Sequence, residues 1–434
     1  MNFRKGNFSK SQIYNWSKKG SIAILDQVLF NGVHFLINIL LARWLVPAKY
    51  GVFAIAFSIF LISAALHSAV LVEPMLVFGA GKYKDSFRKY LGILIAGHFV
   101  ITFFAAIILT IVALLVGRIY SKDVQAALLA LSIGTPFILL LWLLRRAFYA
   151  YLQPIWSALG GAIYFILLLL SVFFLQLCHW LSPATYFLSM GLCSLLISLP
   201  FLYFLRPEWS FTISLDSITI QKEHLRYGQW ALGTNVLSWG VNNSYFVILP
   251  FWIGLEGVAA LRALMNLSTP LIQTNSALSF LLLPILSRHR AESITKMNRT
   301  VKLFLSFFIS GAILYLLGLV FFGGSILRLF YGNKYLQLSG LVPLVALLPL
   351  GTAITVVLEN ALRAIEKTDN VFWCYAVSSS VALFGGILLA VILGVKGVLW
   401  GYIISYLFAS IMMILFYSNF INIHRRQTIL VQND

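Results

Sequence analysis

The chain has 434 residues, of which 60% are hydrophobic and 10% are charged, and its formal net charge at pH 7 is +18. Soluble domains carry about 25% charged residues, so this composition excludes a soluble globular protein and makes a lipid bilayer the solvent of the chain. A net charge of this size would suggest nucleic acid as a partner of a soluble protein. Here the cations follow membrane topology, as described below, which argues against nucleic acid.

Windows of about 20 apolar residues, the length of helix that crosses a bilayer, predict an all-α membrane protein with twelve transmembrane helices. The predicted helices are 22–42, 52–72, 91–116, 125–145, 155–178, 184–205, 229–252, 257–286, 303–322, 338–360, 371–393 and 397–420. The longest polar linker separates six helices from six. The predicted organisation is an N-terminal segment 1–21, an N-lobe 22–205, a linker 206–228, a C-lobe 229–420 and a tail 421–434.

The chain repeats itself across this linker. The stretch Gly20–Ala54 returns as Gly228–Leu261, with glycines and a tryptophan in matching places and with a second apolar helix after a short corner in each copy. Internal repeats in membrane transporters mark two like bundles related by a pseudo-two-fold axis. We therefore expect two pseudo-symmetric lobes of six helices each.

Lysine and arginine gather in alternate loops. If the N-terminus lies inside, the inner segments hold most of these cations and the short outer loops hold few. Cytoplasmic loops carry such an excess, so the bias predicts that both termini and the linker are cytoplasmic. The linker mixes apolar and polar positions, and we expect it either to lie along the inner membrane surface or to serve as a plain tether.

Four segments resemble a known family: LARWLVPAKYGVFA (41–54), RYGQWALGTNVLSW (226–239), GLEGVAALRALMNL (254–267) and LLLPILSR (281–288). They are similar to the polysaccharide-export branch, that of Wzx-like oligosaccharide flippases, of the MATE-like multidrug, oligosaccharidyl-lipid and polysaccharide superfamily. The resemblance implies a two-lobed transporter of twelve helices that works by alternating access. Members closest in pattern flip undecaprenyl-pyrophosphate-linked oligosaccharides from the inner to the outer leaflet.

Polar side chains recur along three predicted helices at spacings that place them on one helical face. Polar groups inside a bilayer are costly unless they face a cavity or a partner. We therefore predict a water-filled cleft between the lobes, lined by amides that suit a sugar. The alternative is that these polar side chains hydrogen bond neighbouring helices to each other. The candidates for substrate binding are Gln27, Asn31, His34 and Asn38 in the first helix, Asn235 and Asn242 in the seventh, and Arg262, Asn266 and Gln273 in the eighth.

Four ionisable residues have specific candidate roles. A guanidinium can hold phosphate oxygens through two hydrogen bonds, so Arg262 is the first candidate for binding pyrophosphate and Arg43 is the second. The alternatives are a snorkelling side chain at Arg262 and an interface anchor at Arg43. Asp26 is either a coupling carboxylate or the counter-ion of a cation on a neighbouring helix. His34 is either a proton-coupling residue or a hydrogen-bonded structural histidine.

Enzyme motifs such as a Walker A loop are missing from the sequence, and the spacing of Cys178, Cys193 and Cys374 is not that of metal ligands. We therefore expect no cofactor and no metal site. The hypothesis is a flippase of lipid-linked oligosaccharide in a bacterial inner membrane, serving O-antigen, lipopolysaccharide or another surface polysaccharide. Membrane lipid, a polysaccharide polymerase and a chain-length protein are the expected partners. The alternatives are a cation-coupled multidrug exporter, in which we would expect carboxylates deep in the cleft, and a polytopic membrane enzyme of polysaccharide assembly.

Overall fold

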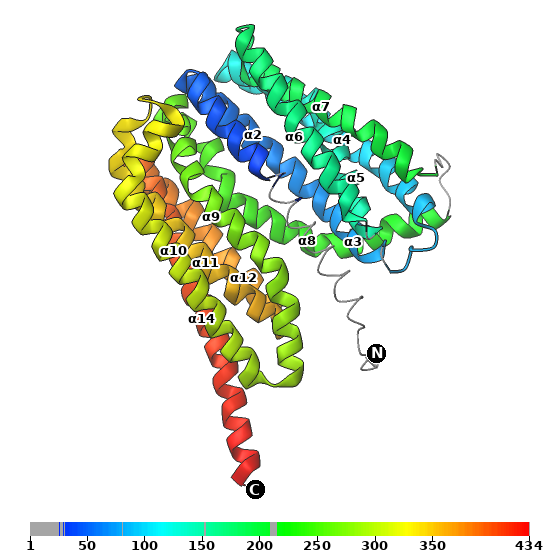
Figure 1. Ribbon diagram of the computed structural model, residues 1–434, viewed down its shortest axis with the longest axis vertical. Helices are drawn as coiled ribbons and strands as arrows, with labels where there is room; N and C mark the ends of the chain where they lie inside the picture. Colours follow the sequence, from blue (N-terminus) through cyan, green and yellow to red (C-terminus); the bar gives the residue numbers. More distant parts are fainter. Residues whose placement is uncertain are drawn as a thin grey trace. The chain divides into compact units, whose positions relative to one another are not determined.

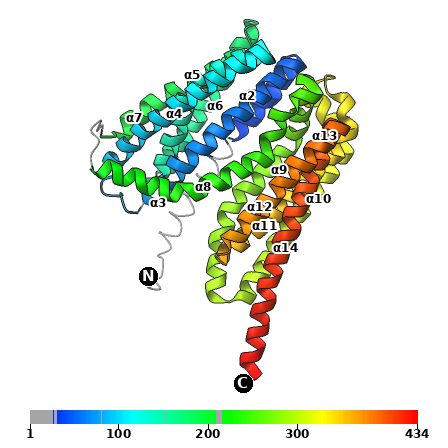
Figure 2. The same ribbon diagram turned by 180° about the vertical axis from the view of Figure 1, so that it is seen from behind.

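The computed structural model describes residues 26, 29, 31–79, 81–151, 153–208 and 215–433, without the side chains of 215–217, 230, 234, 280, 281 and 425–433. The secondary structure of these residues is helical, and no strand occurs among them (Figures 1 and 2). The expectation of an all-α membrane fold is therefore confirmed. The candidate Gln27 lies outside the described residues.

Ten helices in the described part of the chain are long and apolar enough to cross a membrane, as befits a multi-pass membrane protein. They match ten of the twelve predicted helices. Of the other two, the helix predicted at 22–42 is described only in part. The one predicted at 229–252 lies largely in α8 (Leu215–Ile248), where amides such as Asn235 and Asn242 lower the mean hydropathy.

The chain divides into two compact units. Unit 1 comprises Met1–Ile37 and Ser63–Leu232, and unit 2 comprises Asn38–Ile62 and Gly233–Asp434. All three points at which the chain passes between the units lie inside helices: the helical stretch 31–44, α2 (Pro47–His67) and α8. The lobes expected at 22–205 and 229–420 remain a sequence-based prediction.

Unit 1 contains a bundle of four long helices. After α2, the chain continues through a π-helical turn, η1 (Ser68–Val72), and α3 (Glu73–Phe78). The bundle helices are α4 (Phe87–Ile119), α5 (Lys122–Ala150), α6 (Pro154–Leu177) and α7 (Pro183–Leu205). α5 packs between α4 and α7 and buries most of its side chains, whereas α4 exposes apolar ones such as Phe103. α5 is therefore the core helix of this unit.

Most of the linker that the structure describes is the start of α8, which polar contacts fix to the other helices of unit 1. Lys82 forms an ion pair with Glu223. The hydrogen bond from Lys82 within this pair lowers the pKa of the Glu223 carboxyl. The neutral ring of His224 donates from Nδ1 to the Val70 carbonyl oxygen at 2.9 Å and accepts at Nε2 from the Tyr90 hydroxyl at 2.7 Å. Burial of this ring lowers its pKa. The start of α8 is thus a docked helix.

Unit 2 is built from longer helices. They are α9 (Pro250–Glu292), α10 (Ile294–Tyr331), the 3₁₀ turn η2 (Leu336–Leu341), α11 (Val342–Ala364), α12 (Thr368–Ser380), the π turn η3 (Val381–Gly386), α13 (Ile387–Leu393) and α14 (Val395–Asn433) (Figures 1 and 2). Side chains of α9, α10, α11 and α14, among them Leu286, Phe308 and Met413, share one apolar core.

The first turns of α9 contain a break at Gly254, where φ is 65° and ψ is −179°. This backbone region is essentially restricted to glycine. The break lies just before Gly257, in the short corner of the second copy of the sequence repeat. It separates the first turn of α9 from the long spanning part of the helix. The corner is therefore encoded by a single residue without a Cβ.

Candidate functional site

Unit 1 contains a fully buried carboxylate, Asp26. Arg145 donates from Nη2 to Oδ1 of Asp26 at 2.5 Å, and only 6% of the arginine side chain is exposed. The other carboxylate oxygen, Oδ2, accepts hydrogen bonds from the Tyr149 hydroxyl at 2.5 Å and from the Ser157 hydroxyl at 3.0 Å. Arg145 and Tyr149 lie one turn apart on α5, and Ser157 lies on α6. Three donors from two helices therefore enclose one carboxylate.

This geometry makes burial of the two charges tolerable. Moving an ion out of water costs several kcal/mol even after relaxation, and an ion pair offsets this only with good geometry and additional hydrogen bonds. Tyr149 and Ser157 supply those bonds. Gly161, one turn beyond Ser157, supplies the space: a Cβ there would lie 3.0 Å from Asp26 Oδ1 and 3.4 Å from Arg145 Nη2. The site is thus a tight, internally neutralised cluster.

The other candidates of unit 1 follow Asp26 in the first helix. His34 is half-buried, and its ring lies 6.3 Å from the ring of Tyr164 on α6, tilted by 51°. Asn31 is half-buried in the same stretch. The arrangement brings an ionisable ring and an amide into the helix that carries the buried carboxylate. Proton coupling through Asp26 or His34 remains a prediction.

Arg262, on α9, lies among aromatic and amide groups of unit 2. Its Nε donates to Asn38 Oδ1 at 3.3 Å. Its guanidinium carbon lies 5.5 Å from the centre of the Phe57 ring and 5.2 Å from that of Phe246. Each such contact is worth roughly 0.5–2 kcal/mol, depending on exposure. None of the ion pairs formed by the described residues includes Arg262. The cation is thus held by aromatic faces and an amide, without a carboxylate.

Asn266, one turn after Arg262, is buried and bonded to protein groups. Its Nδ2 donates to the Tyr50 hydroxyl at 3.0 Å and lies 3.4 Å from the Tyr331 hydroxyl. Tyr331 in turn donates to the Ala263 carbonyl oxygen at 3.1 Å. These contacts tie α2, α9 and α10 together. They give the Asn266 amide nitrogen partners within the protein, as expected for a residue that holds helices together and not for one that contacts substrate.

Arg43, the second candidate for phosphate, lies at the corner before α2. Its exposed side chain donates from Nη1 to the Leu329 carbonyl oxygen at 3.3 Å. Lys334 donates to the carbonyl oxygens of Arg43 and of Leu45, the latter at 2.8 Å. Both cations therefore fasten the corner to the end of α10 and to the loop that follows.

A polar cavity of about 160 Å³ lies inside unit 2 between α8, α9, α11, α12 and α14. Asn242 lines it, donates from Nδ2 to the Ser238 carbonyl oxygen at 2.8 Å, and accepts at Oδ1 from the Tyr406 hydroxyl at 3.4 Å. Thr352 and Thr355 of α11 line the same cavity. Of the remaining candidates, Asn235 is half-buried on α8 and Gln273 is exposed on α9. The structure thus gathers part of the predicted polar stripes around one internal cavity.

Sequence reasoning missed Arg145, Tyr149 and Ser157. Arg145 stands beside Arg146 at the end of a predicted span, where the sequence pattern is that of an inner-loop cation. The i, i+4 spacing of Arg145 and Tyr149 was the available signal, since it places both side chains on one helical face. The identity of their acidic partner, 119 residues earlier in the chain, carries no local signal.

The comparisons with known proteins place the fold. No family model matches the sequence, and no curated protein matches it. Among solved structures, the chain is similar to an inward-facing multidrug-resistance MATE transporter of the MOP superfamily, with a TM-score of 0.75 at 14% identity over 92% of this chain and 96% of that one. It is also similar to the lipid II flippase MurJ in an inward closed conformation, with a TM-score of 0.74 at 17% identity over 91% and 86% of the two chains.

A eukaryotic MATE transporter is a third similar structure, with a TM-score of 0.67 at 17% identity over 93% of this chain and 95% of that one. All three are membrane transporters or flippases. At these identities the likeness shows a shared fold. The chain therefore has the fold of the MATE transporters and MurJ, the twelve-helix architecture that the sequence predicts.

Proposed function

We propose that the protein is a transporter that flips a polyprenyl-pyrophosphate-linked oligosaccharide across a bacterial inner membrane by alternating access. The pyrophosphate and sugars would cross in a polar path while the polyprenyl tail stays in lipid. The fold supports a transporter, because it is shared with MATE transporters and with a flippase of lipid II. The proposed role in O-antigen or other surface polysaccharide synthesis comes from the sequence resemblance to polysaccharide exporters.

The observation that carries the proposal is the charge balance of the spanning helices. The buried carboxylate Asp26 is neutralised by Arg145. Glu359, near the end of α11, forms an ion pair with Arg363 at 2.5 Å and accepts from the Tyr375 hydroxyl at 2.7 Å. Arg262, by contrast, has no carboxylate partner among the described residues. Asp26 and Glu359 are thus bound to arginine, whereas Arg262 is a cation without a carboxylate partner, and such a cation suits a pyrophosphate.

Export of cationic drugs is the competing function, and it has the same support from the fold, because one of the similar structures is a multidrug MATE transporter. A cationic cargo needs an ionised carboxylate to bind. In the described residues the carboxylates of the first helix and of α11 are both bound to arginine. The charge balance therefore favours the anionic cargo.

Transport in liposomes tests the proposal. Purified protein is reconstituted with a fluorescent oligosaccharide on polyprenyl pyrophosphate, and dithionite bleaches the outer leaflet. In liposomes with protein, we expect dithionite to bleach more than half of the label. In liposomes without protein, bleaching should stop at half. Ethidium efflux from the same liposomes measures the competing function. Ethidium export without lipid flipping would refute the proposal.

The role of Arg262 is tested by a graded series. Lys keeps the charge but loses the forked geometry, so Arg262→Lys should retain part of the flipping rate. Arg262→Ala should lose most of it, and Arg262→Glu should abolish it by repelling phosphate. The matched control is Arg118→Ala, at the exposed end of α4, which should flip normally. A snorkelling anchor predicts instead that Ala lowers the amount of protein in the membrane and leaves the rate per molecule unchanged.

The proposed orientation follows the lysine and arginine bias. Both termini and the linker should be cytoplasmic, so reporter fusions after Asp85 and Glu223 should report the inside, and a fusion near Asn333 should report the outside. An external signal at Glu223 would contradict the topology.

A further inference from the structure

A groove of about 770 Å³ lies in unit 2 between the start of α10 and the last membrane turns of α14. Asn298, Lys302 and Leu305 line it from α10, at helical spacings that place them on one face. Tyr417, Ser418 and Ile421 line it from α14 with the same periodicity. The Tyr417 hydroxyl donates to Asn298 Oδ1 at 3.3 Å, which joins the two walls. The groove therefore lies mainly between two facing helix surfaces, and Leu358 of α11 also lines it.

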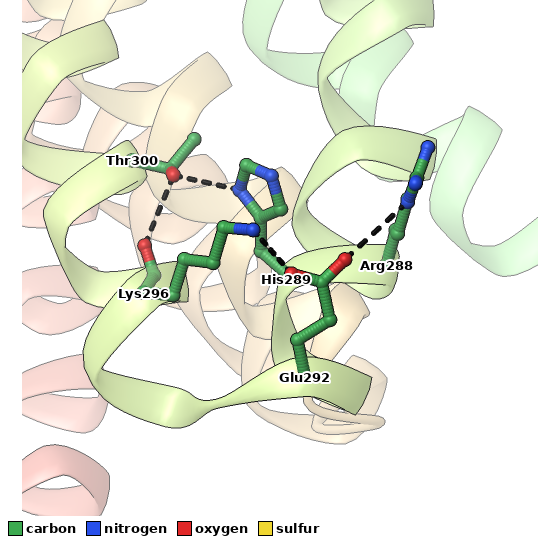
Figure 3. A network of polar contacts seen from close by, with 5 residues as sticks. All are labelled: Arg288, His289, Glu292, Lys296 and Thr300. Atoms are coloured by element: carbon green, nitrogen blue, oxygen red, sulfur yellow. Dashed lines mark hydrogen bonds and ion pairs between the residues drawn. The ribbon is translucent and has the colours of Figure 1, made fainter.

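The corner between α9 and α10, beside this groove, is rich in cations, and Figure 3 shows how most of its charges pair. Arg288 and Lys296 both contact the carboxylate of Glu292, while His289 Nδ1 is hydrogen bonded to the Thr300 hydroxyl at 2.8 Å. One carboxylate thus serves two cations in this corner.

Two cations in the first turns of α10 are left over. Arg290 is paired with Glu366 at 2.9 Å, but neither Arg299 nor Lys302 forms an ion pair or side-chain hydrogen bond among the described residues. Among the described residues, those that line the groove include Lys302 and no Asp or Glu. The polar end of the groove thus has a cationic surplus that an anion would complement.

Both walls change from polar to apolar at the same level. On α10, the polar start ends at Lys302, and the next outward residues, Leu303 and Phe307, are 68% and 64% exposed. On α14, exposed Ile414 and Leu415 precede the polar Asn422. Such exposed apolar side chains face lipid in a membrane protein. The groove therefore crosses the boundary between headgroups and hydrocarbon, with one end suited to a phosphate and the other to an acyl chain.

We propose that this groove binds an anionic phospholipid from the surrounding leaflet. Its phosphodiester lies between Lys302, the Asn298 amide and the Ser418 hydroxyl, and an acyl chain runs over Leu305 toward the lipid-facing surface. Basic pockets between transmembrane helices are recognised sites for anionic headgroups. The apolar half of the groove argues for a lipid over free phosphate. The inference stands independently of the cargo proposed above.

Titration of the purified full-length protein in detergent, followed by native mass spectrometry, tests the inference. The probes are dioleoyl phosphatidylglycerol and, as the zwitterionic comparison, dioleoyl phosphatidylcholine. One lysine near an anionic lipid contributes about 1 kcal/mol, so Lys302→Ala should weaken phosphatidylglycerol binding about fivefold and Lys302→Glu by roughly 25-fold. Phosphatidylcholine binding should not change. The matched control is Arg288→Gln, which removes a paired cation of the same corner and should leave both affinities unchanged.

A bulky side chain tests the shape of the groove separately from its charge. Ser418→Trp should weaken the binding of both lipids, because it fills the space between the walls while leaving Lys302 in place. Inorganic phosphate at millimolar concentration should fail to displace the lipid. Equal affinities for the two lipids in the unmodified protein, unchanged phosphatidylglycerol binding in Lys302→Ala, or displacement by inorganic phosphate would each overturn the inference.

Discussion

The buried pair of Asp26 and Arg145 gives the sharpest prediction about stability. Removing one partner of a buried ion pair leaves an uncompensated charge and costs about 3–5 kcal/mol. Asp26 is fully buried and accepts three hydrogen bonds, so Arg145→Met should reach the upper part of that range. Asp26→Asn should cost less, because a neutral amide still accepts from Tyr149 and Ser157 and leaves only the arginine charge to accommodate.

The double variant isolates the pair. Replacing both charges with uncharged groups of similar volume is often neutral for a buried pair, so Asp26→Asn with Arg145→Met should be more stable than Arg145→Met alone by at least about 2 kcal/mol. The assay is reversible unfolding of purified protein in detergent, with the two single variants and the double variant forming a double-mutant cycle. Additive effects would refute the reasoning, since they would show that the two charges do not stabilise each other in the folded state.

Transport by the same double variant separates the two roles left open for Asp26. A counter-ion is dispensable once its cation is gone, so a stable double variant that still flips lipid would identify Asp26 as a counter-ion to Arg145. A coupling carboxylate is not replaceable by an amide. A stable double variant that binds cargo and fails to transport it would therefore identify Asp26 as the coupling group.

Three further outcomes are expected. Burial lowers the pKa of His224 below 6.5, so its contribution to stability is complete above pH 6.5 and is lost as the pH falls through the folded-state pKa; the unfolding midpoint should drop on acidification from pH 7.5 to 5.5, and His224→Gln should make that drop smaller. Gly254→Ala should cost about 1–3 kcal/mol, because alanine is strained at φ 65°, whereas the same change at Gly311, which has open space and no positive φ, should be neutral or stabilising by unfolding measurements. Gly161→Ala should destabilise the protein and slow transport, since its Cβ would lie 3.0 Å from Asp26 Oδ1, and a wild-type unfolding midpoint would contradict the tight packing described for that cluster.

The helices were predictable because their signal is local. A run of about 20 apolar residues between polar loops specifies a spanning helix without reference to the rest of the chain, and the repeat located the corner that Gly254 forms. The start of α8 was harder, because 206–228 has the composition of a linker. Its docking depends on Glu223 and His224 meeting residues more than 130 positions away, which no local pattern encodes.

The candidate site was predictable in its residue types and only partly in its contacts. The polar stripes identified Asn38 and Arg262, which contact each other although 224 positions separate them. They could not show that Asn266 is satisfied by two tyrosine hydroxyls, or that Phe57 and Phe246 enclose the Arg262 guanidinium. Aromatic residues make up 15% of this chain, so composition does not single out the pair that forms the cation–π contact. The cleft between the lobes remains a prediction.

The passage of the chain between its two units inside helices has a mechanical consequence. A loop between rigid bodies acts as a free hinge, because its dihedral angles change at little cost. Here the connections run through the stretch 31–44, α2 and α8, whose backbone hydrogen bonds resist bending. If the units move during transport, these three helices must bend elastically. Part of the free energy of each cycle is then stored as elastic strain in the three helices. Gly233, the first residue of unit 2 in α8, lowers the resistance of that helix to bending at the crossing point, because glycine is a weak helix former.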